Sequence, residues 1–324
     1  MGLRQFTICF IIDLLVDMKI VILSFYSRLL DRGVETWAEN LKNKIGRGFE
    51  VEIIHGKENA NDWFSKLTLF SKNVFDNLGE IRKADIVVPT NGSVQTFFCR
   101  IICFVWRKPM VIFGHSGPGA DDKWNLLCSP DVFVAFSKAQ KKWVEKYKLP
   151  WTKVKLIHHA VDSNKFKPVK KKPRRKTVLC VAANIPSKRV ALVEKAVESL
   201  PGYRFVAVGK GNETEVGYDK IQDVYKEADV FCFVPWEREA FGLVFLEAMA
   251  SNLPVVTIND KTRTEIVGTA GIFVKNPENS TELAKAIEKA YKTNWGNKPR
   301  KQAEKFGWEK VSKEYEKLFK NLAL

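Results

Sequence analysis

The stretch VFCFVPWEREAFGLVFLEAMA, residues 230–250, joins two apolar runs through a short polar segment. Its first run, residues 230–234, has no alternating polar position, which is typical of a strand buried on both faces of a parallel sheet. Gly242 opens the second run, whose length suits a helix. We therefore predict a strand at 230–234, a loop, and a helix over 242–251, which together make one repeating unit of an α/β fold.

The same unit recurs on both sides of this stretch. In the first half, predicted strands lie at residues 19–24, 51–55, 85–89, 110–113 and 132–136, and predicted helices at 34–45, 61–78, 93–105 and 138–147. In the second half, further strands lie at 177–182, 203–208, 254–258 and 271–274, and further helices at 187–200, 221–228 and 281–293. This alternation predicts an α/β fold of two doubly wound, Rossmann-like domains. Because ligands bind beyond the carboxyl ends of parallel strands, we expect both domains to face one cleft.

The domain boundaries follow from the same pattern. Residues 18–165 form the predicted N-terminal domain and residues 177–300 the predicted C-terminal domain. Between them, residues 166–176 contain two prolines and a dense basic run, as an exposed linker does. Helices at 298–306 and 309–322 end the chain.

Residues 1–17 are an extension of uncertain role. Asp13 and Asp17 interrupt this apolar region, which is too short to span a bilayer and lacks the cleavage site of a signal peptide. The first predicted strand starts directly after Met18. We therefore regard Met18 as a candidate translation start.

The composition describes a basic chain with enough apolar residues for two cores. Of its 324 residues 45% are hydrophobic, and 53 basic residues exceed 37 acidic ones, giving a net charge of +16. A basic surface attracts polyanions such as nucleic acid, anionic lipid headgroups or phosphorylated substrates. The plainer interpretation is that the many lysines only keep the protein soluble. Six cysteines are scattered without a C-x-x-C pair, so we predict reduced thiols in a cytoplasmic protein and no metal site.

The loop before Gly242 has the chemistry of a site for a phosphorylated ligand. Backbone N–H groups at the start of the predicted helix favour an anion, and Gly242 allows the backbone to approach that anion closely. Glu239 in the loop and Glu247 on the helix are suited to accept hydrogen bonds from hydroxyl groups on either side. The plainer interpretation makes both glutamates solvated surface charges, but Glu247 stands among apolar neighbours.

Glu239 and Glu247 form the pattern E-x7-E, and the segment EREAFGLVFLEAMASNLPVV, residues 237–256, resembles the hallmark of the GT-B glycosyltransferases of family 4, the glycosyl transferases group 1. The likeness extends over most of the chain from Met18. It is carried in order by DRGVETWAENL (31–41), VFVAFSKAQKKWV (132–144), IHHAVDSNKFKP (157–168), VYKEADVFCFVPWE (224–237) and TEIVGTAGIFV (264–274). The resemblance implies two Rossmann-like domains facing a cleft, with residues 301–324 returning to the first domain as a helix.

The resemblance implies a donor site in the second domain. Glu239 would contact the hydroxyls of the donor sugar, Glu247 those of the ribose, and Lys188 the diphosphate, where a cation offsets the charge on the leaving nucleotide. Backbone N–H groups for the sugar and diphosphate would come from Phe241, Gly242 and Leu243. Lys188 also has a plainer interpretation as an ordinary lysine in the first turn of a helix.

The resemblance also assigns residues in the first domain and shows departures in the second. Gly33 matches a glycine that lets the backbone approach donor or acceptor, and His115 matches a histidine that lines the cleft near the reacting sugar. A lone histidine is also often a packed core residue. Ala183 stands where the family usually has an arginine, and Arg189 is the candidate to replace that charge. The implied catalytic set is Glu239, Lys188 and His115.

The implied reaction moves a hexose from a nucleotide-diphosphate sugar, with retention of configuration and without a metal or other cofactor, to a lipid-linked, glycan or protein acceptor. Peripheral contact with an anionic membrane would suit the basic charge. One alternative is a glycosyltransferase acting on nucleic acid. Another is a non-catalytic protein that binds nucleotide-sugars or polyanions, which the loss of the arginine at Ala183 favours. An epimerase of the same fold is disfavoured by the E-x7-E context.

Overall fold

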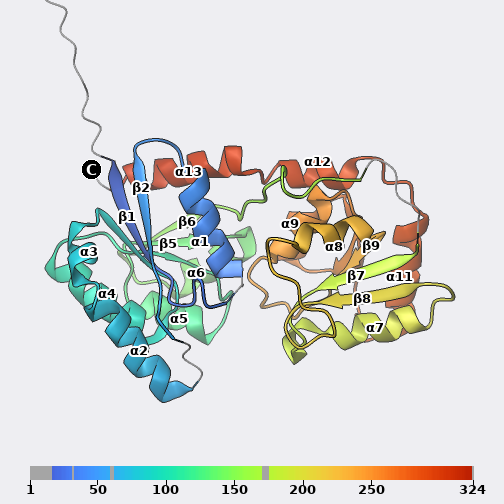
Figure 1. The fold of residues 1–324 in the computed structure, drawn as a ribbon, viewed down its shortest axis with the longest axis horizontal. Helices are drawn as coiled ribbons and strands as arrows, with labels where there is room; N and C mark the ends of the chain where they lie inside the picture. Colours follow the sequence, from blue (N-terminus) through green and yellow to red (C-terminus); the bar gives the residue numbers. More distant parts are fainter. Residues whose placement is uncertain (1–16, 31–32, 59–61, 170–174, 323–324) are drawn as a thin grey trace, which may run out of the picture.

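The computed structural model describes residues 17–30, 33–58, 62–169 and 175–322. Two α/β domains lie side by side and the last helix runs back across the first of them (Figure 1). This confirms the predicted architecture. The prediction for residues 1–17 falls almost entirely outside the described residues, as do residues 170–174 of the predicted linker.

The first domain is built on six parallel strands in the order β2-β1-β3-β4-β5-β6. A single bridge between Val87 and Met110 joins the three-stranded groups on either side of it. The strands are β1 (Met18–Leu23), β2 (Phe49–Ile54), β3 (Ile86–Pro89), β4 (Val111–Phe113), β5 (Val132–Ala135) and β6 (Lys153–Leu156). The helices are α1 (Gly33–Lys44), α2 (Trp63–Phe75), α3 (Leu78–Lys83), α4 (Ser93–Val105), α5 (Ala120–Leu127) and α6 (Lys138–Tyr147).

The second domain has five parallel strands in the order β8-β7-β9-β10-β11. The strand order reverses between β7 and β9, because the chain moves outward to β8 on one side and to β10 and β11 on the other. In folds of this kind ligands bind between the loops that follow the two strands at this point. The strands are β7 (Thr177–Val181), β8 (Arg204–Val208), β9 (Val230–Cys232), β10 (Val255–Ile258) and β11 (Gly271–Val274). The helices are α7 (Val190–Glu198), α8 (Ile221–Glu227), α9 (Leu243–Ala250), α10 (Lys261–Val267) and α11 (Ser280–Lys292).

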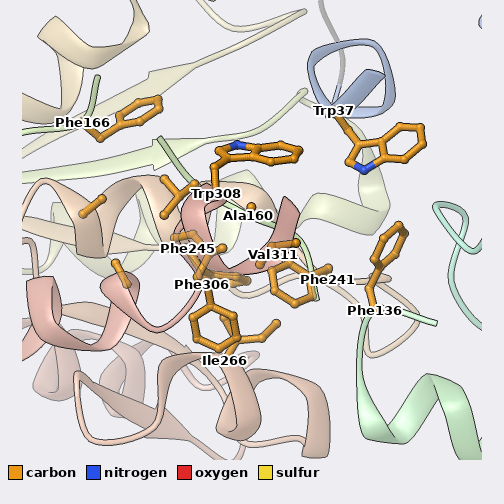
Figure 2. Packing of buried hydrophobic residues seen from close by; sticks show 14 of the residues in the cluster. Trp37, Phe136, Ala160, Phe166, Phe241, Phe245, Ile266, Phe306, Trp308 and Val311 are labelled. Carbon is orange, nitrogen blue, oxygen red and sulfur yellow. The ribbon is translucent and has the colours of Figure 1, made fainter. Parts of the chain in front are cut away.

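Two C-terminal helices tie the domains together. The first, α12 (Lys298–Glu304), packs on α9 of the second domain, and the second, α13 (Trp308–Lys320), packs on α1 of the first. Between them, Phe306 and Trp308 enter one apolar cluster that contains side chains of both domains, among them Trp37 and Phe241 (Figure 2). The domain interface is therefore a continuous part of the hydrophobic core.

The structure corrects several predicted elements. The helix expected over residues 61–78 is shorter, since α2 ends at Phe75 and the next helix, α3, begins only at Leu78. The helix expected from residue 187 starts as a 3-10 turn, Pro186–Lys188, and α7 follows only after Arg189, which has a left-handed conformation (φ +52°). Four elements were not predicted: α3, α5, β6 and α10. They are short, and none is long enough to show a clear apolar period.

A buried hydrogen bond between Trp37 and Tyr315 fastens α13 to α1, and its loss should destabilise the protein. The indole Nε1–H donates to the tyrosine hydroxyl at 3.0 Å, and both side chains are buried. Tyr315→Phe leaves the indole N–H without an acceptor, so we expect the free energy of unfolding to fall by about 1–3 kcal/mol. Urea denaturation measures this loss. Tyr147→Phe removes an exposed hydroxyl and is the control; equal effects of the two changes would contradict the assignment.

Candidate functional site

An ion pair lies at the carboxyl ends of β7 and β9, the two strands between which the strand order of the second sheet reverses. Lys188 follows β7 and Glu239 follows β9, and the lysine ammonium donates to Glu239 Oε2. Both side chains are only partly exposed. The ammonium also lies 5.9 Å from the centre of the Phe233 ring. The structure therefore brings together two residues that are 51 positions apart in the sequence, at the crevice that the topology predicts.

The start of α9 lies directly beside this pair. Gly242 has φ +84°, and a Cβ there would come within 2.7 Å of the Phe245 ring, so only glycine fits without displacing that ring. Phe241 before it is buried, and Leu243 begins the helix. The first N–H groups of a helix have no partner within the helix and carry the positive end of its dipole. This helix end is suited to an anion next to Lys188.

Glu247 is buried one turn further along α9, with 6% of its surface exposed. The Tyr225 hydroxyl donates to its Oε2 at 2.7 Å, and Tyr218 also hydrogen-bonds to the carboxyl group. Burial raises the pKa of Glu247 to about 7, against the opposing effects of the two tyrosines and Lys165. The carboxyl group is therefore poised between its neutral and ionised forms near neutral pH.

A small cavity connects Glu247 to the first domain. Its volume is about 10 Å³, close to the space of one water molecule. It is lined by Thr36, Trp37, Asn40, His159, Ala160, Val161, Tyr218, Leu243, Glu247 and Trp308. Tyr218 spans it, since its hydroxyl group bonds to Asn40 of α1 as well as to Glu247. A nucleotide at Glu247 therefore requires Tyr218 to move or the domains to separate.

Two histidines approach from the first domain. His115 follows β4, and its ring lies 4.7 Å from Trp37 and 5.3 Å from His159. The residue is half-buried, but its Nε2 is fully enclosed and has no hydrogen-bond partner among the described residues. Burial lowers the pKa of His115 to about 3, so the ring is neutral at pH 7. A neutral imidazole here can exchange a hydrogen bond with a hydroxyl group but supplies no charge.

His159, which the sequence analysis missed, has the same character. It follows β6 and stacks on Phe136 with ring centres 3.7 Å apart. Its Nδ1 is buried without a hydrogen-bond partner among the described atoms, and burial again lowers the pKa of the ring. Its position after a strand end was the available signal, but that strand was not predicted.

The loops of the two domains touch at the site. Gly117, with φ +75°, would place a Cβ 2.2 Å from the carbonyl oxygen of Arg238 and 3.0 Å from the nitrogen of Ala240. The loop that carries His115 therefore lies directly on the backbone of the loop that carries Glu239. Gly33 at the start of α1 also faces the second domain, since a Cβ there would lie 3.7 Å from Leu243 Cδ1.

The side chain of Arg189 does not pair with Glu239, the partner of Lys188. Its guanidinium pairs with Glu278 at 2.9 Å, whereas Lys188 next to it pairs with Glu239. The left-handed backbone at Arg189 separates the two side chains. In this structure Lys188 contacts the predicted site and Arg189 contacts Glu278 beyond β11.

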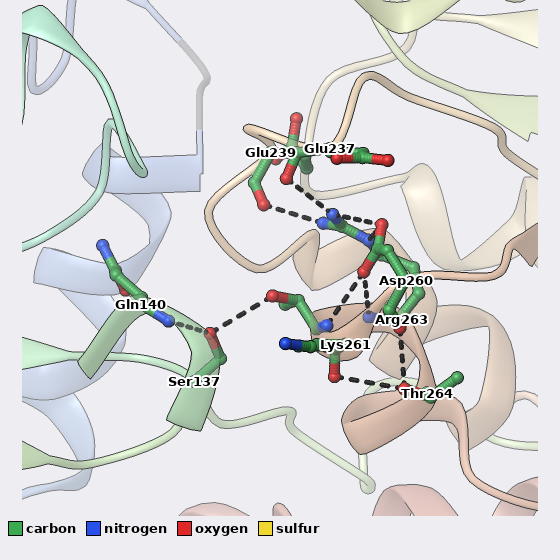
Figure 3. Close-up of polar contacts among 9 residues, drawn as sticks. Ser137, Gln140, Glu237, Glu239, Asp260, Lys261, Arg263 and Thr264 are labelled. Carbon is green, nitrogen blue, oxygen red and sulfur yellow. Dashed lines mark hydrogen bonds and ion pairs between the residues drawn. The ribbon is translucent and has the colours of Figure 1, made fainter. Parts of the chain in front are cut away.

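A buried arginine that the sequence analysis missed holds the Glu239 loop (Figure 3). Arg263 of α10 has no exposed surface, and its guanidinium donates to the carbonyl oxygens of Glu239 at 2.7 Å and Glu237 at 2.9 Å. Its Nε donates to Asp260, which also caps α10. The spacing of Asp260 and Arg263 was visible in the sequence, but nothing indicated that the arginine turns inward.

Contacts beside Arg263 also reach the first domain. The Ser137 hydroxyl, which caps α6, lies 3.3 Å from the hydroxyl of Thr262, and Glu265 bonds to the backbone N–H of Lys138 and to His158. Within the described residues, no group of three or more His, Cys, Asp or Glu side chains is placed to hold a metal ion. Over the same residues, no helix combines the length and apolarity needed to cross a membrane.

Comparison with known proteins identifies the segment around the two glutamates. Residues 214–308 match the family described as Glycosyl transferases group 1. An uncharacterized glycosyltransferase of Methanocaldococcus jannaschii, MJ1607, is 33% identical over 114 residues, which are 32% of this chain and 28% of that protein. Sulfoquinovosyl transferase SQD2 of Arabidopsis thaliana is 25% identical over 192 residues, 48% of this chain and 37% of that protein. The chain thus spans about a third of the length of these two relatives.

The whole fold also has solved counterparts. The structure of Anabaena Alr3699/HepE in complex with UDP and glucose superposes with a TM-score of 0.74 over 94% of this chain and 99% of that one, at 17% sequence identity. At this identity the likeness concerns the fold alone. The protein therefore has the two-domain fold of GT-B glycosyltransferases, and its residues 214–308 are similar to the Glycosyl transferases group 1 family.

Proposed function

We propose that the protein is a glycosyltransferase that takes its sugar from a nucleoside-diphosphate sugar held between the two domains. The observation that carries this proposal is the Lys188–Glu239 ion pair. It lies between the ends of β7 and β9, where the strand order reverses, and directly beside the start of α9. A cation, a free helix start and a carboxylate are the groups that a diphosphate followed by a sugar requires. The group 1 domain match and the UDP and glucose bound by a protein of the same fold support the proposal.

The roles follow from the contacts. The donor diphosphate takes Lys188 away from Glu239 and lies against the N–H groups of Phe241, Gly242 and Leu243. Glu239 is then free to accept hydrogen bonds from the donor sugar, and Glu247 accepts those of the ribose. The positive charge of Lys188 and of the helix start stabilises the leaving diphosphate.

The first domain supplies the other wall of the site. The backbone at Gly33 approaches the start of α9, and the neutral ring of His115 hydrogen-bonds to the transferred sugar or to the acceptor hydroxyl. Arg189 remains a proposed donor residue only if binding releases it from Glu278. Membership of family 4, a hexose donor, retention of configuration and catalysis without a metal are proposed from the resemblance of the sequence. The proposed acceptor is lipid-linked, glycan or protein.

A second candidate is a protein that binds a nucleotide-sugar without turning it over. Two observations favour it: Ala183 replaces the usual arginine, and Arg189 is engaged with Glu278. A third, a transferase acting on nucleic acid, has the net charge of +16 in its favour. Binding without turnover would support the second, and salt-dependent binding of DNA at physiological ionic strength would support the third.

Glu239→Gln tests the proposed function. Incubation with UDP-, ADP- and GDP-hexoses should release nucleoside diphosphate slowly with one of them. Glu239→Gln should lower that rate about 10- to 100-fold, because the donor sugar loses a charged hydrogen-bond acceptor. Glu237→Gln, an exposed change two residues away, is the control and should leave the rate within about twofold. Absence of both binding and turnover with every donor would refute the proposal. The anomeric configuration of the product, read by NMR, tests retention separately.

Arg263→Lys tests whether the buried arginine positions Glu239. Lysine keeps the charge but cannot reach two carbonyl oxygens and Asp260 together, so we expect the free energy of unfolding to fall by about 2–4 kcal/mol. Donor affinity should fall as well, because the Glu239 loop loses its support. Lys261→Ala, an exposed change in the first turn of the same helix, is the control. A large loss of stability with unchanged donor affinity would limit Arg263 to a structural role.

Glu247→Gln should change the pH dependence of stability. The unfolded carboxyl has a pKa near 4.5 and the folded one near 7, so ionisation of the buried group costs stability increasingly as the pH rises from 4.5 to 7. Glutamine removes this cost, so the stability of the variant relative to the parent should rise by about 2.5 kcal/mol between pH 5 and pH 8. Urea denaturation at the two pH values measures the gain. A parallel pH dependence in parent and variant would contradict it.

The same variant tests the proposed ribose contact. Glutamine cannot accept two hydroxyl hydrogen bonds as a carboxylate does, so donor affinity should fall about tenfold at pH 8 even as stability rises. Calorimetric titration with the donor measures the affinity. Burial also raises the pKa of Asp122 to about 7. Its contribution to the pH dependence of stability is the same in parent and variant, so it cancels when the two stabilities are compared.

A further inference from the structure

One helix of the first domain is apolar on its outer as well as its inner face. The inner face of α4 buries Cys99, Ile102 and Cys103 against the sheet. Its outer face places Phe97, Ile101 and Phe104 in one row, at the spacing of four and three residues that aligns side chains along a helix. These three are 43%, 46% and 74% exposed. A surface helix normally presents polar residues on this side, so the row indicates a surface that something covers.

The apolar surface continues onto the neighbouring helix. The indole N–H of Trp124 on α5 donates to the carbonyl oxygen of Ser93 at 2.8 Å, which places Trp124 against the first turn of α4. Leu127 follows one turn later and is 66% exposed. Two residues beyond it, Ser129 accepts a hydrogen bond from the indole of Trp151, which is itself 65% exposed. We call the set Phe97, Ile101, Phe104, Trp124, Leu127 and Trp151 the apolar face.

The apolar face lies on one layer of the domain. Buried residues of α2 to α6 share a single hydrophobic cluster on one side of the sheet, whereas α1 and α13 contribute to the cluster on the other side. The helices α4 and α5 pack together, as do α5 and α6. Their outer surfaces therefore form one continuous side of the molecule, on the lower left in Figure 1.

The charged side chains of the segment that contains the apolar face are mostly positive. Residues 93–153, which contain it, carry ten basic side chains and four acidic ones. Of the acidic four, Asp122 is buried and Asp131 pairs with Arg100. On α6, Lys142 and Lys146 are exposed one turn apart. Lys123 lies 4.5 Å from the centre of the Tyr147 ring.

We propose that the apolar face docks on a bilayer that contains anionic lipid. Exposed Phe, Ile and Leu side chains flanked by Trp, Tyr and Lys are the composition of a surface that sits in the headgroup region, with the apolar groups below and the cations against lipid phosphate. Since α4 has 13 residues, it is too short to span a bilayer and lies along its surface. An acidic protein partner would not require the apolar row, and a second copy of this chain would bring its own lysines against these.

The position of the apolar face agrees with a lipid-linked acceptor, a step of the argument that rests on the proposed function. The helix α5 begins directly after the loop that carries His115 and Gly117, and this loop lies on the backbone of the Glu239 loop. An acceptor anchored in the bilayer beneath α5 therefore has a short path to the cleft. Docking itself needs no transferase activity and is measured without it.

Vesicle flotation with the full chain tests the proposal. At physiological ionic strength the protein should float with vesicles of phosphatidylcholine mixed with phosphatidylglycerol and remain unbound with phosphatidylcholine alone. Phe104→Ser combined with Leu127→Ser should lower the partition coefficient about tenfold or more, because both side chains lose their transfer into the bilayer. Circular dichroism and donor affinity should be unchanged, since both residues are exposed and lie outside the donor site.

A matched pair of charge variants separates the proposed surface from general basicity. Lys142→Glu with Lys146→Glu should lower the partition coefficient about tenfold or more. Lys285→Glu with Lys289→Glu makes the same change in net charge on exposed positions of α11, in the second domain, and should leave vesicle binding within about twofold. Equal losses from the two pairs would overturn the proposal.

Two further outcomes would overturn the docking proposal. One is vesicle binding that is unaffected by Phe104→Ser with Leu127→Ser. The other is absence of vesicle binding together with a dimer that these two changes dissociate in sedimentation, because the apolar face would then be an interface between copies. Donor hydrolysis measured without vesicles keeps the two proposals apart: its failure leaves docking standing, and failure of docking leaves the donor site standing.

Discussion

The guanidinium of Arg263 sets the strictest constraint on this structure. A charge with no contact with water is stable only when its donors find acceptors, and here they find the carboxylate of Asp260 and the carbonyl oxygens of Glu237 and Glu239. The loop after β9 must therefore keep its carbonyl groups turned toward α10. Its side chains then face the other way, and Glu239 is left at the end of β7, where Lys188 meets it. The predicted donor groups are thus placed by an interaction that lies behind them.

The domain interface adds a second constraint on the same loop. Gly117 of the first domain lies so close to the backbone of Arg238 and Ala240 that no side chain fits between them. In addition, α13 and the apolar cluster around Phe306 and Trp308 hold the first domain against the second. The cavity at Glu247 is accordingly about 10 Å³, and Tyr218 joins Asn40 to the carboxyl group across it. A nucleotide at Glu247 would require this polar contact to break, through movement of Tyr218 or through separation of the two domains.

The strands were predictable because they are buried on both faces. Continuous apolar runs gave β1 to β5 and β7 to β11, and the E-x7-E pattern marked the loop and helix of the second domain. The strand β6, with the sequence KVKL, alternates lysine with apolar residues at the edge of its sheet, so the same criterion passed over it. His159 was missed with it. The helix α10 has only seven residues, most of them polar. In such a segment an arginine such as Arg263 is expected to point into solvent. Its inward turn depends on carbonyl groups 24 and 26 residues away, which no local pattern contains.

The two domains present different side chains where they meet. In the second domain Lys188 is partly exposed and lies beside the carboxylate of Glu239. In the first domain His115 and His159 lie among Trp37, Phe136 and one another, and burial there favours the neutral ring. The wall formed by the second domain therefore suits phosphate, and the wall formed by the first suits neutral hydroxyl groups. The basic residues of the first domain lie instead around the apolar face on α4, α5 and α6, away from these histidines. The first domain thus keeps the rings of His115 and His159 close to the second domain and exposes its lysines on α5 and α6.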